Sequence, residues 1–179
     1  MSKLTTLLFI MVICATTSVA QPTRKDLDGK YFHLKGTVYE VDMFAAASKA
    51  AADVEVLVYQ DSEIFVAFNT ASRGLYEFYL PVGHEYELVF GGKEFVNKKV
   101  YVDTRLVPEE KKPQVFDLDM GLFRPLDGQE FPVLQEAFVQ VGYDEELAKL
   151  AANLEYTEEK AAMLDKQFKK IKKQLDKTK

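Results

Sequence analysis

Apolar residues recur at every second position through the first two-thirds of the chain. In the first such stretch, Leu34, Gly36 and Val38 alternate with Lys35 and Thr37. This period of two is typical of half-buried strands, because successive side chains point to opposite faces. Turn signals rich in Gly, Pro and Asp separate the stretches, so the pattern predicts a mostly β protein, a seven-stranded antiparallel sandwich. The other stretches lie around residues 54–58, 64–68, 76–80, 86–90, 100–102 and 116–120.

The C-terminal residues 144–179 change to the period of a helix, with Asp144 as the expected N-cap and Thr157 as a second cap. Eight lysines against four acidic residues give residues 157–179 a net charge of +4. We expect a charged amphipathic helical tail that either docks on the sandwich or self-associates through residues 157–175 as a short coiled coil. Its apolar positions are Leu147, Leu150, Ala151, Leu154, Ala161, Leu164, Phe168, Ile171 and Leu175.

Residues 1–20 have the features of a secretory signal peptide. Lys3 precedes an apolar run over residues 7–15, and the small residue Ala20 stands where a signal peptidase cleaves. The run is too short to span a bilayer, and no later stretch is long enough. We therefore expect an exported mature chain that begins at Gln21 and has no transmembrane segment.

The rest of the chain is expected to divide into four parts. Residues 21–31 form a polar lead, and residues 32–124 contain the predicted strands of the sandwich domain. Residues 125–143 form a connecting segment without a clear period, and residues 144–179 form the helical tail. A chain of this length suits one domain with an appendage.

The composition argues against several classes of function. Cys14 is the only cysteine and lies within the predicted signal peptide, so we expect no disulfide and no thiolate metal ligand in the mature chain. The chain has 23 basic and 28 acidic residues and a net charge of −5. An acidic balance argues against nucleic acid or an anionic membrane as the principal partner.

The stretch VGHEYELVF contains the spacing H-x-x-E at His84 and Glu87, which some zinc enzymes use for two ligands. In an extended strand, residues three apart point to opposite faces, so this pair is not expected to converge on a metal. The other histidine, His33, lies in a different predicted strand. Nucleophile and phosphate-loop motifs are absent from the sequence.

A weak Ca²⁺ site is the remaining metal hypothesis. Asp117 and Asp119 share one face of the last predicted strand, and Asp103 is the third candidate ligand. Oxygen ligands of this kind suit Ca²⁺, although a solvated strand face is the simpler interpretation. The sequence therefore predicts no cofactor and a protein that is not an enzyme.

The segments LKGTVYEV, ADVEVLVYQ, RGLYEFYLPVGHEYELVF and FVNKKVYVDT resemble the carboxypeptidase regulatory-like, or transthyretin-like, β-sandwich family. The resemblance covers roughly residues 32–123. In residues 42–52, where the family has a short turn, alanines predict a longer loop with one helical turn. The matching positions are Leu34, Gly36, Val38, Gly74, Tyr76, Phe78, Leu80, Pro81, Gly83, Tyr86, Leu88 and Phe90.

The resemblance implies an immunoglobulin-like or prealbumin-like sandwich without catalytic residues. In that family the sandwich is an accessory module, common in exported proteins of Bacteroidota-type bacteria. It therefore implies a structural or protein-interaction role in the cell envelope, in the periplasm, at the outer membrane or after secretion. Fold-level resemblance names no partner.

Several aromatic residues occupy strand positions that alternation assigns to the outer faces. Exposed aromatic residues at such positions form a patch that calls for a cover or a ligand. One hypothesis is that the tail covers the patch with Leu164, Phe168 and Ile171. The alternative is a binding platform for a glycan, peptidoglycan or an envelope protein. The candidate residues are Tyr39, Tyr59, Phe65, Tyr79 and Tyr101.

Overall fold

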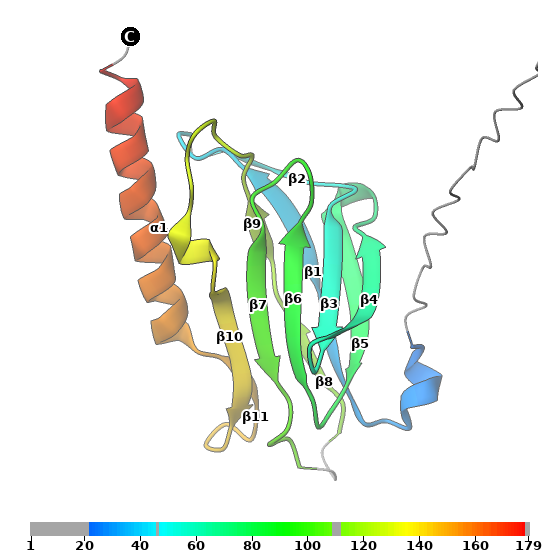
Figure 1. The fold of residues 1–179 in the computed structure, drawn as a ribbon. Helices are drawn as coiled ribbons and strands as arrows, with labels where there is room; N and C mark the ends of the chain where they lie inside the picture. The colour runs from blue at the N-terminus through cyan, green and yellow to red at the C-terminus, as the bar shows by residue number, and fades with distance from the viewer. Residues whose placement is uncertain (1–21, 46, 109–111, 178–179) are drawn as a thin grey trace, which may run out of the picture.

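The computed structural model describes residues 22–45, 47–108 and 112–177. Two β-sheets pack face to face, and a long C-terminal helix lies beside them (Figure 1). The predicted signal peptide lies outside the described residues, and the polar lead contains a short 3-10 helix, η1 (Arg24–Leu27). Within the described residues, no helix is long and apolar enough to cross a bilayer.

The first sheet has five strands arranged around the long strand β1. One side of β1 pairs with β5 and the other with β8 and then β9, while β2 pairs with the end of β1. The glycine at position 36 of β1 is required because a Cβ there would lie 2.0 Å from the carbonyl oxygen of Leu118. The strands are β1 (Tyr31–Val41), β2 (Ser48–Ala50), β5 (Leu75–Pro81), β8 (Gln114–Asp117) and β9 (Met120–Leu122).

The second sheet has six strands in the order β11-β10-β7-β6-β3-β4. All of its pairs are antiparallel except β7 with β10, which is parallel. This sheet faces the viewer in Figure 1, in front of the five-stranded sheet. Its strands are β3 (Glu55–Gln60), β4 (Glu63–Asn69), β6 (Glu85–Gly91), β7 (Lys98–Asp103), β10 (Ala137–Asp144) and β11 (Lys149–Ala152).

The core between the sheets consists of the inward residues that the period of two predicted. Burial of such side chains stabilises each by about 1.5–3 kcal/mol before the cost of ordering is counted. The tyrosines of the core also satisfy their hydroxyls: Tyr86 donates to the carbonyl of Pro81 at 2.6 Å, and Tyr76 donates to that of Leu118. The fully buried aliphatic and aromatic residues include Leu34, Val38, Val56, Val58, Phe78, Leu80, Leu88, Phe90, Val100 and Val102.

The prediction of a β-sandwich is confirmed, but the prediction of seven antiparallel strands is wrong. In the described residues, eleven strands form two mixed sheets, because β8 and β9 run parallel to β1, and β10 runs parallel to β7. The last predicted strand divides into β8 and β9 where the N–H of Leu118 reaches the carbonyl of Lys35 and Asp119 accepts from the N–H of Thr37. In the alanine-rich segment, residues 48–50 form β2 in place of the expected loop.

The prediction of a helix from Asp144 is also wrong. Residues 137–152, assigned to the connecting segment and the tail, form the hairpin β10–β11 at the edge of the six-stranded sheet. Asp144 accepts from the N–H of Leu147 at 2.8 Å and so supports the hairpin turn. Leu150 lies in the sandwich core. The helix α1 (Leu154–Leu175) begins after Asn153, whose side chain accepts from the N–H of Tyr156.

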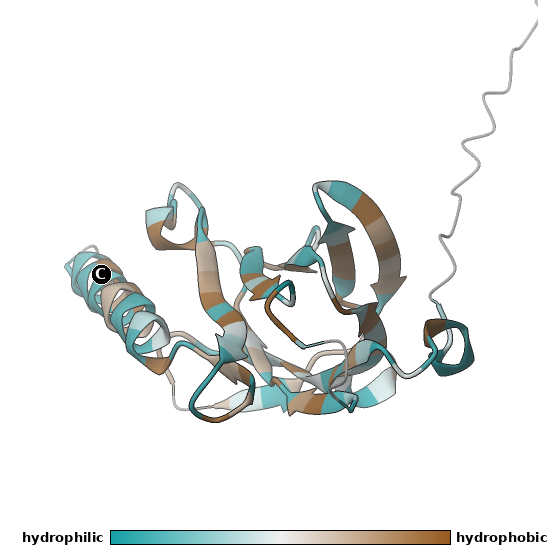
Figure 2. Cartoon of the chain, turned by 90° about the horizontal axis from the view of Figure 1, so that it is seen from below, coloured by the Kyte–Doolittle hydropathy of each residue, from teal (hydrophilic) through white to brown (hydrophobic). Residues whose placement is uncertain are grey.

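A second, smaller core joins α1 to the sandwich. Leu164 and Ile171 are buried there, and the rings of Phe123, Phe131 and Phe168 meet edge to face at centroid distances of 4.8–5.7 Å. The helix contacts β10 and the 3-10 helix η3 (Pro132–Leu134). A further 3-10 turn, η2 (Ser72–Gly74), precedes β5. Seen from below, α1 lies beside the sheets and not over either face (Figure 2). The tail therefore docks on its own chain.

Candidate functional site

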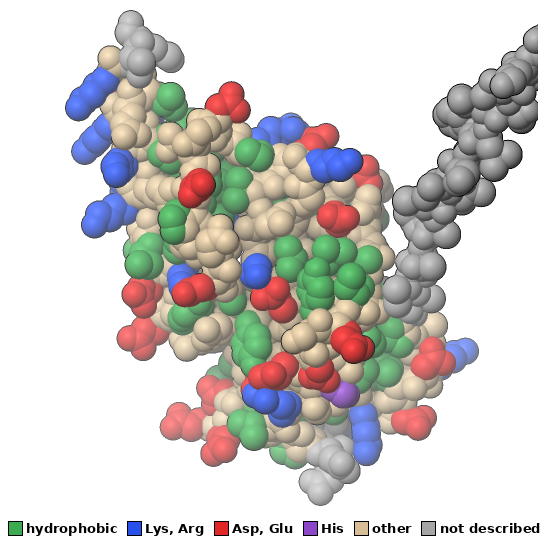
Figure 3. All heavy atoms as spheres, viewed as in Figure 1, with side chains coloured by type: hydrophobic (Ala, Val, Ile, Leu, Met, Phe, Trp, Pro, Cys, Tyr) green, Lys and Arg blue, Asp and Glu red, His purple; other side chains and the backbone are tan. Residues whose placement is uncertain are grey.

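The outer face of the six-stranded sheet carries an apolar patch over β3, β4 and β6 (Figure 3). The core residues of β3 point inward, so the alternate positions Leu57 and Tyr59 point outward. Leu57 lies opposite Val89 of β6 and Ala67 of β4, and Tyr59 lies opposite Ile64. We call these five residues the sheet patch. Ile64 is 55 % exposed, and no described helix or strand lies over this part of the sheet.

A β-bulge in β4 determines which side chains belong to the sheet patch. The register shifts between Val58 and Tyr59, so Ile64 takes the outward position opposite Tyr59. Phe65 turns toward the core, where its ring lies 6.1 Å from that of Tyr86. A bulge places two successive residues on the same side of a strand. The predicted outward position of Phe65 is therefore wrong.

The other four predicted aromatic residues divide between the two sheets. Tyr59 and Tyr101 share the outer face of the six-stranded sheet, with Glu87 between them in the register. Tyr39 and Tyr79 belong to β1 and β5 of the five-stranded sheet. The ring of Tyr79 stacks on that of His33 at 4.7 Å. The fold therefore does not bring the five predicted residues together on one platform.

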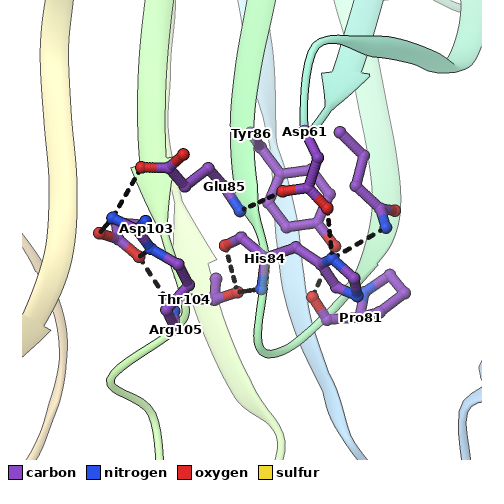
Figure 4. Close-up of polar contacts among 9 residues, drawn as sticks. Asp61, Pro81, His84, Glu85, Tyr86, Asp103, Thr104 and Arg105 are labelled. Atoms are coloured by element: carbon purple, nitrogen blue, oxygen red, sulfur yellow. Dashed lines mark hydrogen bonds and ion pairs between the residues drawn. The ribbon is translucent and has the colours of Figure 1, made fainter.

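A polar cluster borders the sheet patch at the end of the sheet where β6 begins (Figure 4). Arg105 lies 2.7 Å from carboxylate oxygens of both Glu85 and Asp103, and its hydrogen bonds lower the pKa of Asp103. The hydroxyl of Tyr101 donates to Glu85. Partial burial and this bond raise the pKa of Tyr101 to about 12. These side chains hold one another in fixed positions at the rim.

His84 is held in the same cluster by a carboxylate. Its Nδ1 lies 2.7 Å from Asp61 and 3.1 Å from the side-chain nitrogen of Gln60. The short contact with Asp61 requires a proton on Nδ1, and the bond from His84 lowers the pKa of Asp61. A protonated Nδ1 cannot accept a hydrogen bond from the Gln60 amide nitrogen. The Gln60 amide in the opposite orientation would present its oxygen, which can accept from this proton. The hydroxyl of Thr104 bonds to both the N–H and the carbonyl of His84, so it is occupied by backbone.

The described residues do not assemble the metal sites considered from the sequence. Glu87 pairs with Lys99 at 3.2 Å and does not join His84. The proposed calcium ligands are also separated, because Asp103 lies on the six-stranded sheet and Asp117 on the five-stranded sheet. Across residues 22–45, 47–108 and 112–177, no three His, Asp or Glu side chains are grouped to hold a metal ion.

The pattern of outward aromatic residues predicted Tyr59 but not the aliphatic part of the sheet patch. Leu57 and Val89 sit among polar alternates in the stretches VEVLVYQ and YELVF. Their position opposite each other in the sheet follows only from the β3–β6 register. Apolar residues at outward positions of two strands would have been the available signal.

Comparison with known proteins places the chain in no family. No family model matches the sequence, and no curated protein matches it significantly. Three solved bacterial structures align with roughly half of the chain, at identities from 9 to 13 % and TM-scores below 0.4. At these values the likenesses carry no inference about function, and the family resemblance stays a prediction from the sequence.

The first of these structures is a minor pilin of Streptococcus agalactiae, with 12 % identity, a TM-score of 0.39, and coverage of 57 % of this chain and 48 % of the pilin. This chain thus spans about half the length of that protein. The second is the N-terminal domain of the shaft pilin SpaA of Lactobacillus rhamnosus GG, with 9 % identity, a TM-score of 0.38, and coverage of 56 % and 99 %. The third is the TIE protein of Bacillus anthracis, with 13 % identity, a TM-score of 0.37, and coverage of 52 % and 18 %.

Proposed function

We propose that this protein is a non-enzymatic module that binds another protein through the sheet patch. The observation that carries the proposal is the contiguous apolar surface of Leu57, Ile64, Ala67 and Val89 beside Tyr59, on a face that α1 leaves uncovered. Apolar patches rimmed by polar residues mark interaction sites on soluble proteins. The rigid sheet beneath it keeps the loss of conformational entropy on binding small.

The chemistry of the sheet patch favours a protein over a glycan. Four of its five residues are aliphatic, whereas a sugar-binding platform needs several exposed aromatic rings on one surface. The five aromatic residues that suggested such a platform are divided between two sheets, and Phe65 turns toward the core. An apolar centre with a polar rim is the usual anatomy of a protein–protein interface.

The polar cluster at the rim supplies orientation to this interface. Arg105 is 53 % exposed while it bridges Glu85 and Asp103, so it can donate to a partner without leaving these carboxylates. Charged groups that are held in place add specificity and speed of association more than affinity. In line with the expected signal peptide, we place this binding in the cell envelope, in the periplasm or at the outer membrane.

Site-specific photo-crosslinking in cells of the source organism tests the proposal. A photoreactive amino acid replaces Ile64 in the sheet patch or, as the matched control, Val115 on β8 of the other sheet. These side chains are 55 % and 57 % exposed, so solvent access is equal. We expect a discrete protein adduct from position 64 that the added substitution Leu57→Asp abolishes. Equal adducts from positions 64 and 115, or none from 64, would refute the function.

A further inference from the structure

The C-terminal half of α1 carries lysines on the side opposite its buried residues. From Lys166 to the end of the helix at Leu175, the sequence contains five lysines and no acidic residue. Four of them lie on the side away from Leu164 and Ile171, and all four are exposed. Blue side chains mark this edge of the molecule in Figure 3. We call this surface the lysine face, and it consists of Lys166, Lys169, Lys170 and Lys173.

The stability of the helix itself does not account for the lysine face. Like charges four positions apart repel, as Lys166 and Lys170 do, whereas pairs of opposite charge stabilise an exposed helix. Of the four lysines, only Lys169 has an ion pair with another described residue, Asp165. The helix dipole favours cations in the last turn and so accounts for Lys173, but Lys166 lies more than two turns before the end of α1. An anionic partner would relieve this repulsion.

The lysine face lacks the apolar centre of a protein–protein interface. Between residues 166 and 173 the large apolar side chains are Phe168 and Ile171, and both belong to the second core. The cations are all lysines, since α1 contains no arginine. Arginine has the planar, bidentate geometry that recognises one particular carboxylate or phosphate, whereas lysine acts as a point charge. The lysine face therefore suits an array of mobile negative charges.

The position of α1 allows a flat surface to reach all four lysines together. The helix lies beside the two sheets (Figure 2), and its buried side is the one that faces them. No described helix or strand lies outside the lysine face. The step from Lys166 to Lys173 covers about 10 Å of helix. A planar array of charges can therefore approach this edge of the molecule along the length of the lysine face.

The acidic balance of the whole chain does not prevent such a contact. The net charge of −5 belongs to the entire sequence, whereas exposed charges are largely screened beyond about 10 Å at ordinary salt concentrations. A charged surface therefore responds mainly to the side chains that it approaches. The acidic residues within α1 all precede Lys166, so the C-terminal half of the helix is locally cationic. They are Glu155, Glu158, Glu159 and Asp165.

We propose that the lysine face docks the protein on a membrane of anionic phospholipids. With the expected export of the chain, this is a membrane surface in the cell envelope. The inference does not rest on the proposed function, because the lysine face and the sheet patch are separate surfaces that point in different directions (Figure 3). A membrane on the α1 side leaves the sheet patch open to its own partner.

Sedimentation with lipid vesicles tests the proposal on the chain from Gln21 onward. The vesicles contain phosphatidylcholine with roughly 30 % phosphatidylglycerol, or phosphatidylcholine alone. Each lysine near an anionic membrane strengthens binding about fivefold. We therefore expect the variant with Lys166→Gln, Lys170→Gln and Lys173→Gln to bind the anionic vesicles about a hundredfold more weakly than wild type. Binding should also be lost at about 0.5 M NaCl.

A matched control changes three exposed lysines elsewhere, Lys25, Lys112 and Lys149, to glutamine and so alters the net charge equally. It should bind the anionic vesicles as wild type does. Circular dichroism should show unchanged helix content in both variants, since lysine and glutamine have similar helix propensities. An equal loss of binding in both variants would assign the effect to net charge and overturn the inference.

Two other results overturn the inference as well. One is equal binding of the wild type to anionic and neutral vesicles, which would show that charge does not direct the contact. The other is no binding to the anionic vesicles, even if the protein binds long-chain polyphosphate as a linear polyanion. Leu57→Asp separates the inference from the proposed function, because this substitution should abolish the adduct at position 64 and leave vesicle binding unchanged.

Discussion

The imidazole Nδ1 of His84 lies 2.7 Å from a carboxylate oxygen of Asp61, and this contact joins two turns at one end of the six-stranded sheet. The other oxygen of Asp61 accepts from the N–H of Glu85 at 3.2 Å. One carboxylate thus connects the β3–β4 turn to the start of β6. The polar rim of the sheet patch depends on this link.

Asp61→Asn should lower the melting temperature near neutral pH and have little effect in acid. The bond from His84 holds the pKa of Asp61 below its ordinary value. Between the folded and the ordinary pKa, the unfolded chain therefore binds more protons than the folded chain. The stability it contributes is present above the ordinary pKa and is lost as the pH falls through the folded value. Asn tolerates the left-handed conformation of residue 61, φ 48°, which Ala would strain.

Melting curves of both proteins between about pH 3 and 7 measure this effect. We expect the two melting temperatures to converge as the pH falls. A difference that stays constant over this range would show that the ionised carboxylate makes no contribution through its shifted pKa.

Lys98→Met should stabilise the protein. Lys98 is buried, its Nζ lies 4.3 Å from the centroid of the Phe138 ring, and desolvation lowers its pKa to about 8. A buried ammonium is costly, and Met keeps the length and packing of the chain, so we expect a gain of roughly 1–3 kcal/mol at pH 7. Denaturant unfolding measures the change.

The pH dependence separates charge from packing at this position. Between about pH 8 and 10.5 the unfolded chain holds a proton on Lys98 that the folded chain has released. Wild-type stability should therefore rise through this window relative to Lys98→Met, and the advantage of the variant should shrink. An advantage that is independent of pH would assign the gain to packing.

Leu164→Ala should cost about 2–4 kcal/mol of unfolding free energy, because it opens a cavity in the second core beneath α1. The neighbouring residue gives a matched control: Met163 is 52 % exposed, and Met163→Ala should change stability by less than about 0.5 kcal/mol. Chemical denaturation of both variants tests the docking of the helix. Equal, small effects would mean that α1 does not pack on the sandwich in solution.

Gly36→Ala should destabilise the sandwich by about 1–3 kcal/mol, because the added methyl meets the carbonyl oxygen of Leu118, 2.0 Å from the Cβ position. The same carbonyl oxygen of Leu118 accepts the hydrogen bond from the hydroxyl of Tyr76. Gly142→Ala on β10 is the control, since nothing lies within 4 Å of a Cβ there. Thermal unfolding should separate the two variants clearly. Equal melting temperatures would contradict the close approach of β1 and residue 118.

Periodicity predicted the inward residues of the sandwich well and those of the helix in part, since the predicted apolar positions Leu154 and Leu175 are exposed. Phe78, Leu88, Leu164 and Ile171 are buried as their spacing indicated, because a side chain's direction follows from local backbone geometry. It failed at residues 144–152, where Leu147 and Leu150 suit the spacing of either a helix or a hairpin. Pairing with β10 decided between them.

The sequence by itself determined that this chain forms strands with one buried face, followed by an amphipathic helix. Only the tertiary structure decided that β10 pairs in parallel with β7, that the bulge in β4 exposes Ile64 and turns Phe65 toward the core, and that α1 docks at the edge of the sandwich. Which strands become neighbours, and in which direction, depends on contacts between residues far apart in the chain. A local period contains no information about those contacts, and the sheet patch exists only because of them.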